Sequence, residues 1–247
     1  VMTGYSENSL VSGLSFLAEK QATIANNLAN VNTASFKRRA AIAQASDGPF
    51  RSMLDERLAS IEFAERTDLG AGSIKETGNR LDVAIEGQQW LRVADKDGAQ
   101  FYTRNGQLQI SREGTLTVGD GLELLDTGGQ PIRIGTGPDA PNDLSISPNG
   151  TVSNPETNAQ IGRLALVTLP KPQDLKPVGR GLYVDPKSQQ TTQTATGLRQ
   201  GALEGSNVNS LQELVAMISV ERSFAATQRA LKGVNQLEEN MISQMLR

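Results

Sequence analysis

The stretch LVSGLSFLAEKQATIANNLANV, residues 10–31, carries the clearest structural pattern in this chain. Its apolar residues recur at alternating steps of four and three positions, with Gln21 as the one polar residue on the ladder. The apolar members are Leu10, Leu14, Leu17, Ile24, Leu28 and Val31. An average step of about 3.5 residues is the seam of a coiled coil and is narrower than the stripe that covers a globular core. The spacing predicts a helix from about Ser6 to Asn32.

A second seam of the same kind lies near the end of the chain, with Thr227 and Glu238 as its polar members. Its apolar members are Met217, Val220, Phe224, Leu231, Val234, Met241 and Met245. Ser206 or Asn207 is the expected N-cap of this helix, because such side chains accept hydrogen bonds from backbone N–H groups. Two terminal seams favour helices that pack on each other and on neighbouring subunits. The spacing alone leaves an ordinary two-helix cap on a globular domain as the alternative.

Between the helices the pattern changes to short runs with a period of two, which is typical of strands. The clearest runs are Leu81–Ile85, Gln107–Ile110, Thr115–Val118 and Ile161–Val167. Dipeptides that favour turns are spaced as antiparallel hairpins require; they are Asn105-Gly106, Glu113-Gly114, Asp120-Gly121 and Gly128-Gly129. The predicted fold class is therefore α+β, with paired long N- and C-terminal helices, coiled-coil-like, flanking a central antiparallel β domain.

Changes in composition divide the chain into four expected segments. Residues 1–45 form an N-terminal helix domain, and residues 46–80 form an extended arm or linker with a short amphipathic piece around Met53 to Phe63. Residues 81–200 form the central β domain. Residues 201–247 form the C-terminal helix, which completes the N-terminal domain.

Composition excludes several classes of protein. The 247 residues include 24 basic and 27 acidic side chains, a net charge of -3, so the chain has no electrostatic footprint for nucleic acid. No window approaches 18 consecutive apolar residues, and the amino end resembles no signal peptide, so we expect neither membrane insertion nor a cleaved signal. The absence of cysteine and histidine removes disulfides, the Ser-His triad and thiolate or imidazole metal sites. We expect no catalytic residue, no metal ligand and no cofactor.

A hydrolase that uses two carboxylates on a β scaffold is the alternative from a different class. It would need two acidic groups about 5 to 9.5 Å apart in a cleft, and no pair in the sequence suggests itself. The segment Asp95-Lys96-Asp97-Gly98 resembles the start of a calcium loop but lacks the later ligands and the closing Glu. We expect the acids of this region to serve turns and surface contacts; they are Asp82, Glu86, Asp95, Asp97 and Asp120.

Four parts of the chain resemble one known family. The matching segments are Ile24–Thr33 (IANNLANVNT) with Phe36-Lys37-Arg38, Thr77–Gly87 (TGNRLDVAIEG), Tyr102–Gly106 (YTRNG) and Leu203–Asn209 (LEGSNVN). Together these segments resemble the bacterial flagellar axial proteins, the family of rod and hook subunits. Two departures concern the local backbone, because a residue other than glycine resists a positive φ. Ser35 stands where the family usually has Gly before Phe, and Gln88-Gln89-Trp90 stands where Asp-Gly-Phe is common.

The resemblance implies a structural subunit that is not an enzyme. Short rod subunits of the family lack a middle β domain and hook subunits carry more, so this chain resembles a proximal-rod or a distal-rod subunit. The compact strand Gly162–Val167 and the return Gly179–Val184 favour the proximal rod, with the distal rod as the alternative. The family implies export through the flagellar secretion apparatus without a cleaved signal. It also implies assembly with itself and with other rod subunits into the helical drive shaft that transmits torque across the periplasm to hook and filament.

The predicted assembly interface consists of the two seams together with neighbouring residues, most of which are polar. Asparagine is a mediocre helix former that hydrogen-bonds backbone groups or neighbouring chains. The predicted interface residues are Leu10, Leu14, Leu17, Ile24, Asn26, Asn27, Leu28, Asn30, Val31, Asn32, Phe36, Asn207, Leu214, Met217, Val220, Phe224, Leu231, Val234, Met241 and Met245.

Overall fold

The computed structural model describes residues 3–45, 61–136, 141, 143–187, 192–193 and 197–245. The chain divides into two compact units, each assembled from segments that are far apart in the sequence. The first unit contains Val1–Val31, Arg38–Asp68 and Val208–Arg247, and the second contains Asn32–Lys37 and Leu69–Asn207. The polypeptide therefore passes repeatedly from one unit to the other.

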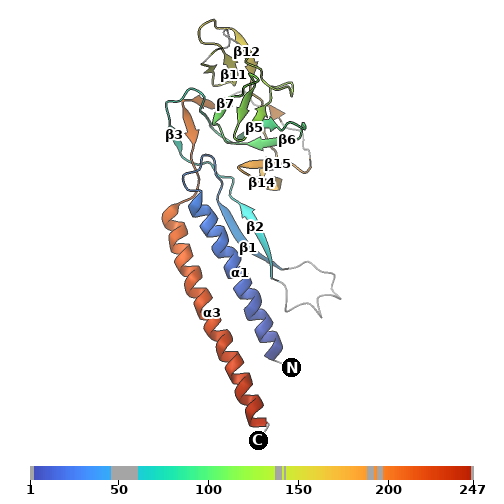
Figure 1. Ribbon diagram of the computed structural model, residues 1–247, viewed down its shortest axis with the longest axis vertical. Helices are drawn as coiled ribbons and strands as arrows, with labels where there is room; N and C mark the ends of the chain where they lie inside the picture. Colours follow the sequence, from blue (N-terminus) through green and yellow to red (C-terminus); the bar gives the residue numbers. More distant parts are fainter. Residues whose placement is uncertain are drawn as a thin grey trace. The chain divides into compact units, whose positions relative to one another are not determined.

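Two long helices dominate the first unit, α1 (Thr3–Ala29) and α3 (Ser210–Met245). They lie side by side (Figure 1) and form the most extensive contact between any two of the described elements. The predicted pairing of the terminal helices is confirmed. The α1 helix ends at Ala29, before the predicted Asn32, because tighter turn hydrogen bonds take over: the N–H of Asn30 reaches the carbonyls of both Asn26 and Asn27.

The C-terminal helix begins later than predicted, and the expected cap at Ser206 or Asn207 is wrong. The side-chain oxygen of Asn209 accepts hydrogen bonds from the N–H groups of Leu211 and Gln212 at 3.1 and 3.2 Å. Asn209 is therefore the N-cap of α3, since it satisfies two of the backbone donors that have no partner within the helix.

A strand pair that the sequence analysis did not predict completes the first unit. Strands β1 (Arg39–Ala45) and β2 (Ile61–Thr67) run antiparallel, with Arg39 opposite Thr67 and Ala45 opposite Ile61. Strand β1 lies in the segment that was expected to be the N-terminal helix domain, residues 1–45, and β2 lies within the expected arm, residues 46–80. The amphipathic piece predicted around Met53 to Phe63 lies mostly outside the described residues.

The second unit is built from short antiparallel strands. Its largest sheet has the order β14-β15-β6-β5-β9-β8-β7, and β13 pairs with both β5 and β16. The members of this sheet are β5 (Gln89–Ala94), β6 (Gln100–Thr103), β7 (Leu108–Ile110), β8 (Leu116–Val118), β9 (Leu122–Leu124), β13 (Leu166–Thr168), β14 (Lys176–Gly179), β15 (Leu182–Val184) and β16 (Thr192–Gln193). The turn before β14 contains a short 3-10 helix, η1 (Pro172–Asp174).

Smaller sheets complete the second unit. Two of them join a segment that precedes the large sheet to a segment that follows it, so that β4 pairs with β17 and β3 pairs with β18. A third has the order β10-β11-β12. The strands are β3 (Ile74–Glu76), β4 (Val83–Ile85), β10 (Ser145–Ile146), β11 (Thr151–Ser153), β12 (Gln160–Arg163), β17 (Leu198–Gln200) and β18 (Ala202–Glu204).

The sheets of the second unit enclose one main apolar core. Strands β4 and β8 are buried at every position, so they lack the alternation of a strand with one solvated face. Leu91, Leu116 and Leu124 are among its fully buried side chains. The predicted fold class, α+β with terminal helices flanking antiparallel sheets, is confirmed.

Two strand-level predictions in this unit are wrong. The run Ile161–Val167 is divided between β12 and β13, which belong to different sheets, because the Leu164 N–H turns to the carbonyl of Gly150. Asn105-Gly106 joins β6 to β7, which do not pair with each other, so it is not a hairpin turn. Gly106 is instead a point of close approach: a Cβ atom there would lie 1.7 Å from the Val83 carbonyl oxygen.

Candidate assembly interface

The seam predicted on each terminal helix is used within the chain, where α1 packs against α3. Ile24 and Val220 are the most buried members, with 4% and 3% of their surfaces exposed. The others with described side chains are half-buried: Leu10, Leu14, Leu17, Leu28, Val31, Met217, Phe224, Leu231 and Val234. The side chains of Met241 and Met245 lie outside the described part of the chain. The seams therefore hold the subunit's own helices together, and most of their residues keep some exposed surface.

The polar residues of the predicted interface are not equivalent. Asn26 and Asn32 are exposed, and Asn30 donates to the carbonyl of Asn26 at 2.8 Å. Phe36 and Asn207 belong to the second unit, where the Asn207 N–H donates to the Phe36 carbonyl at 3.3 Å. These two are half-buried.

Asn27 is completely buried and joins three elements of the first unit. Its side-chain amide donates to the Arg39 carbonyl at 2.8 Å and to Glu213 Oε2 at 3.2 Å, and its oxygen accepts from the Arg39 N–H at 3.0 Å. Glu213 is 1% exposed and also accepts from Arg38 Nε at 2.5 Å. This cluster ties α1 and β1 to the first turn of α3. Asn27 thus stabilises the subunit from within.

One face of α3 is apolar but remains exposed. Its members recur at steps of three and one residues, and their exposed surface fractions range from 49% to 70%. They are Leu211, Leu214, Val215 and Ile218. At about 100° of rotation per residue, this outer stripe lies on the side of the helix opposite the seam. Soluble monomers rarely leave a contiguous apolar patch uncovered unless it is a binding surface. The sequence analysis identified only Leu214 of this group, because it looked for one seam per helix.

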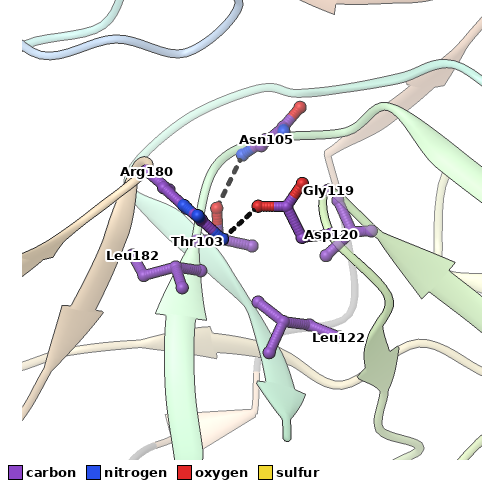
Figure 2. Close-up of a pocket in the computed structure, with 8 residues that line it drawn as sticks. Thr103, Asn105, Gly119, Asp120, Leu122, Arg180 and Leu182 are labelled. Atoms are coloured by element: carbon purple, nitrogen blue, oxygen red, sulfur yellow. Dashed lines mark hydrogen bonds and ion pairs between the residues drawn. The ribbon is translucent and has the colours of Figure 1, made fainter.

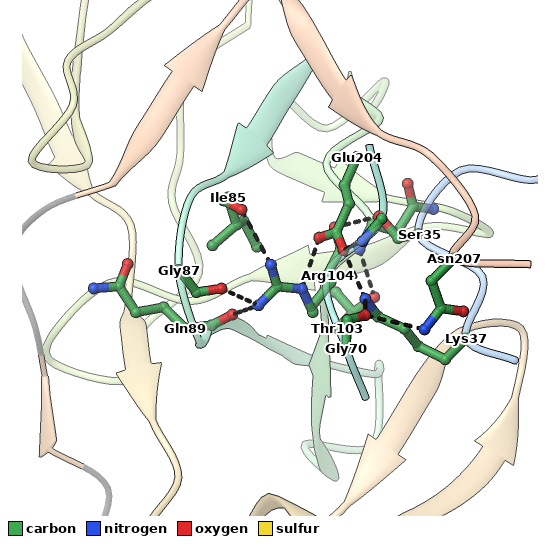
Figure 3. Close-up of polar contacts among 12 residues, drawn as sticks. Ser35, Lys37, Gly70, Ile85, Gly87, Gln89, Thr103, Arg104, Glu204 and Asn207 are labelled. Atoms are coloured by element: carbon green, nitrogen blue, oxygen red, sulfur yellow. Dashed lines mark hydrogen bonds and ion pairs between the residues drawn. The ribbon is translucent and has the colours of Figure 1, made fainter. Parts of the chain in front are cut away.

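A second buried cluster, within the second unit, surrounds the carboxylate of Glu204 (Figure 3). Its Oε1 accepts from Lys37 Nζ at 2.6 Å and from the Gly72 N–H at 2.8 Å, and its Oε2 accepts from Arg104 Nε at 2.7 Å. The side chains of Lys37, Arg104 and Glu204 are 0%, 3% and 1% exposed. Burial alone would raise the pKa of Glu204, but the Arg104 charge and the hydrogen bonds from Lys37 and Gly72 hold it below its ordinary value.

Ser35 belongs to the same cluster and explains one of the two sequence departures. Its φ is +55°, in the left-handed region that favours glycine. The hydroxyl donates to the Arg104 carbonyl at 2.6 Å, and the backbone N–H donates to the Glu204 carbonyl at 2.8 Å. The backbone therefore keeps the conformation that glycine would adopt, and the serine side chain adds a hydrogen bond that glycine could not make.

The Arg104 guanidinium also contacts the second segment that departs from the family pattern, Gln88-Gln89-Trp90. It donates to the carbonyls of Ile85, Gly87 and Gln89 at 3.1, 2.9 and 2.8 Å. It lies 5.8 Å from the centre of the Trp90 ring, which packs edge-on against Tyr183 with ring centres 5.0 Å apart. The bulky Trp90 is thus accommodated as part of a small aromatic cluster.

The hollow that would have to hold a substrate for catalysis by two carboxylates has only one acid in its lining. A hollow of about 170 Å³ between the β8–β9 and β14–β15 turns (Figure 2) has an apolar lining that includes Leu122 and Leu182. It is smaller than a usual ligand pocket, about 300 to 1,000 Å³. Asp120 is the single acid that lines it, and it pairs with Arg180 at 2.5 Å. The two-carboxylate geometry of a glycosidase is therefore not formed there.

The other acids mostly behave as predicted. Asp95 caps its own hairpin turn by accepting from the N–H groups of Asp97 and Ala99 at 3.0 and 2.8 Å. Asp82 differs, because it is 7% exposed and accepts from Thr77 Oγ1 at 2.7 Å and from the Asn79 amide at 3.2 Å. No group of three or more acidic, His or Cys side chains that could hold a metal ion occurs in the described ranges. Among the same residues, no helix has the length and apolar character needed to span a bilayer.

The sequence of this chain is similar to those of known proteins. Three family models match: the flagellar basal body rod protein at residues 8–37, the FlgE/F/G D1 domain of the flagellar hook protein at residues 84–154, and the C-terminal region of the FlgEFG basal body rod proteins at residues 199–245. The flagellar basal-body rod protein FlgF of Escherichia coli K12 is 32% identical over 234 residues, which cover 87% of this chain and 88% of that protein. This chain belongs to the flagellar basal-body rod protein family.

Rod proteins with two different names match to similar extents. FlgF of Salmonella typhimurium is 30% identical over 89% of both chains, and FlgG of Bacillus subtilis is 29% identical over 94% of this chain and 96% of that protein. The family predicted from the sequence is confirmed. The rod subunit is a structural component of the flagellar basal body, without enzymatic function, and it assembles with other rod subunits. The matched range 8–37 contains Asn27, Ser35 and Lys37, which belong to the two buried clusters.

Proposed function

We propose that this rod subunit belongs to the proximal rod and self-assembles, through its terminal helices, into the helical shaft that carries torque from the motor to the hook and filament. The observation that carries the proposal is the outer stripe of α3, an apolar face that the subunit's own α1 does not cover. A helical polymer requires contacts between different surfaces of successive copies, which repeat without closing into a ring. The outer stripe and the partly exposed seam are two such surfaces.

The outer stripe supplies the contact without being needed for the fold of the subunit. Leu211 and Val215 are 70% and 62% exposed, so their burial in a polymer would remove apolar surface from water at about 25 cal/mol per Å². Arg222 and Arg229 follow on the same side of the helix and are exposed. The apolar contact is therefore confined to the first turns of α3, and charged side chains continue that face.

Replacing Leu214 by Asp tests the stripe. A charge there remains solvated in the free subunit, where exposed substitutions usually change stability by no more than about 0.5 kcal/mol, but it would be buried without a partner in the polymer. We expect normal helix content and thermal unfolding, with loss of incorporation into basal bodies and loss of swimming. Gln228→Asp, on an exposed position of the same helix outside the stripe, is the matched control and should swim normally. Normal incorporation of the Leu214→Asp protein would contradict the proposal.

The assignment to the proximal rod rests on two features of the sequence, one β domain of modest length and the β14–β15 return. FlgG relatives match over as much of the chain as FlgF relatives do, so the distal rod is the alternative. A short rigid tag in the exposed turn at Asp97-Gly98 would locate the subunit by electron cryo-tomography of basal bodies. Tag density at the motor end supports the proximal rod, and density at the hook end supports the distal rod.

The proposal includes the route to the rod and its place in the periplasmic space. We infer export through the flagellar secretion apparatus without removal of a signal peptide. The intact mass of the protein from isolated basal bodies should equal that of the translated chain, allowing for loss of an initiator methionine. A shorter mass, with a new amino terminus, would show cleavage and contradict this route.

A further inference from the structure

The segments that carry the polypeptide into and out of the second unit meet at one side chain. Residues 32–37, 69–73 and 204–207 all lie at the borders of that unit. The Glu204 carboxylate receives Lys37 from the first of these segments and the Gly72 N–H from the second, and it belongs to the third (Figure 3). Residues 69–73 and 204–207 are separated by more than a hundred residues of the β domain, yet a single carboxylate bonds to all three segments.

Backbone contacts among the three segments are few. The Ser35 N–H donates to the Glu204 carbonyl, the Gly205 N–H to the Ser73 carbonyl at 2.7 Å, and the Asn207 N–H to the Phe36 carbonyl. The short β3–β18 ladder lies beside two of these segments and pairs Glu204 with Ile74. The side-chain bonds to the carboxylate therefore provide much of what holds residues 32–37 in place.

Charge makes the carboxylate indispensable to this arrangement. One buried anion stands between two buried cations, and these cations also donate to neutral carbonyls, such as that of Gly70, which accepts from Lys37 at 2.7 Å. Without the negative charge, Lys37 and Arg104 would be like charges in a dry site with no anion between them. Breaking a buried ion pair by removing one partner is strongly destabilising for this reason.

The apolar core is formed largely by other contacts. The main core cluster contains residues such as Leu91, Leu116 and Leu124; Ile85, also a member, accepts from Arg104 through its carbonyl. Local openings of a protein can proceed in separate cooperative parts. The border segments and the core can therefore respond differently to one substitution.

We propose that Glu204 acts as a clamp: residues 32–37 and 69–73 become ordered only when residues 204–207 dock against them. The borders of the second unit then become ordered together, and only after the C-terminal segment has reached them. This inference goes beyond the proposed function, and it holds for a proximal or a distal rod subunit alike. A chain whose residue 204 carries no charge is expected to have a folded core with unordered borders.

Hydrogen exchange of the full-length, dilute protein near neutral pH tests the clamp with Glu204→Gln, which keeps the shape of the side chain and removes its charge. We expect peptides that contain residues 32–37 and 69–73 to exchange on the order of 100-fold faster than in the unmodified protein, while peptides of β5 and β8 change less than about twofold. Glu76→Gln is the matched control, because Glu76 pairs with Arg199 at the surface. Exposed pairs contribute little, so no segment should change.

The double variant Lys37→Met, Glu204→Gln removes one cation together with the anion and returns the buried cluster to its original net charge. It should restore at least part of the protection of residues 32–37. Unchanged exchange of both border segments in Glu204→Gln would overturn the proposal. It would also be overturned if the core exchanged as fast as the borders, or if the protein did not fold, because the carboxylate would then be an ordinary requirement of the core.

Discussion

Lys37 and Glu204, 167 residues apart in the sequence, form an ion pair of 2.6 Å in which both side chains are almost fully removed from solvent. Arg104 shares the same carboxylate at 2.7 Å. These three residues lie in three of the segments that resemble the flagellar axial family: Phe36-Lys37-Arg38, Tyr102–Gly106 and Leu203–Asn209. The family resemblance in these segments therefore coincides with one buried cluster.

The pH dependence of stability should reveal this cluster. Because the folded-state pKa of Glu204 lies below the ordinary value of 4.5, its stabilising effect is complete above that value and is lost as the pH falls through the folded-state pKa. Lys37 and Arg104 are the charged groups that face it. Urea unfolding should show a large difference between the unmodified protein and Glu204→Gln at pH 7, and the two should converge as the pH is lowered below 4.5. A constant difference down to pH 2 to 3, about two units below the ordinary value, would contradict the assignment.

Substitutions at Ser35 should separate backbone strain from hydrogen bonding. Ser35→Gly relieves a left-handed conformation that costs about 1–2 kcal/mol and loses a hydroxyl bond of similar value, so its unfolding free energy should change little. Ser35→Ala loses the bond and keeps the strain, so it should destabilise by about 1–2 kcal/mol. Equilibrium unfolding in urea measures both. Equal effects of the two substitutions would show that the positive φ is not a significant cost.

Asn27 and Asn26 are adjacent but should behave differently. Asn27→Ala removes three hydrogen bonds within the first unit and leaves the Arg39 N–H without its partner, which should destabilise that unit by about 1–3 kcal/mol. Asn26 is exposed, and Asn26→Ala should leave stability unchanged or slightly higher, because alanine is the better helix former. Helix unfolding followed by circular dichroism distinguishes the two. If Asn26 also contacts neighbouring subunits, its substitution should lower swimming without lowering stability.

Asp82 should be the most sensitive of the acids that the sequence analysis assigned to turns and surface. It accepts bonds from Thr77 and Asn79 in a nearly buried position, so Asp82→Ala should destabilise the second unit by about 1–2 kcal/mol. Asp97→Ala, at an exposed turn, should stay within about 0.5 kcal/mol of the unmodified protein. Thermal unfolding of the two variants in parallel measures this difference, and similar unfolding temperatures would refute it.

Local pattern was enough to predict the helices and several turns. The 3.5-residue ladders gave both terminal helices and their mutual packing, because a helix buries whatever recurs at that spacing. Glu113-Gly114 and Asp120-Gly121 do join strands that pair, β7 with β8 and β8 with β9. The pairing of distant strands, such as β3 with β18, could not be predicted from the sequence pattern, because a run of three residues specifies neither the partner strand nor the register.

The sequence by itself determined the family, the helical seams and the absence of histidine and cysteine chemistry, because each depends only on which residues occur and how they are spaced. Tertiary structure decided which charges are buried. Lys37 and Arg38 are neighbours of the same charge, yet Lys37 pairs with Glu204 in the second unit and Arg38 pairs with Glu213 in the first. A charge can be buried only where a partner of opposite charge arrives from elsewhere in the fold. The spacing of residues along the chain does not specify which charged residues become neighbours in the fold.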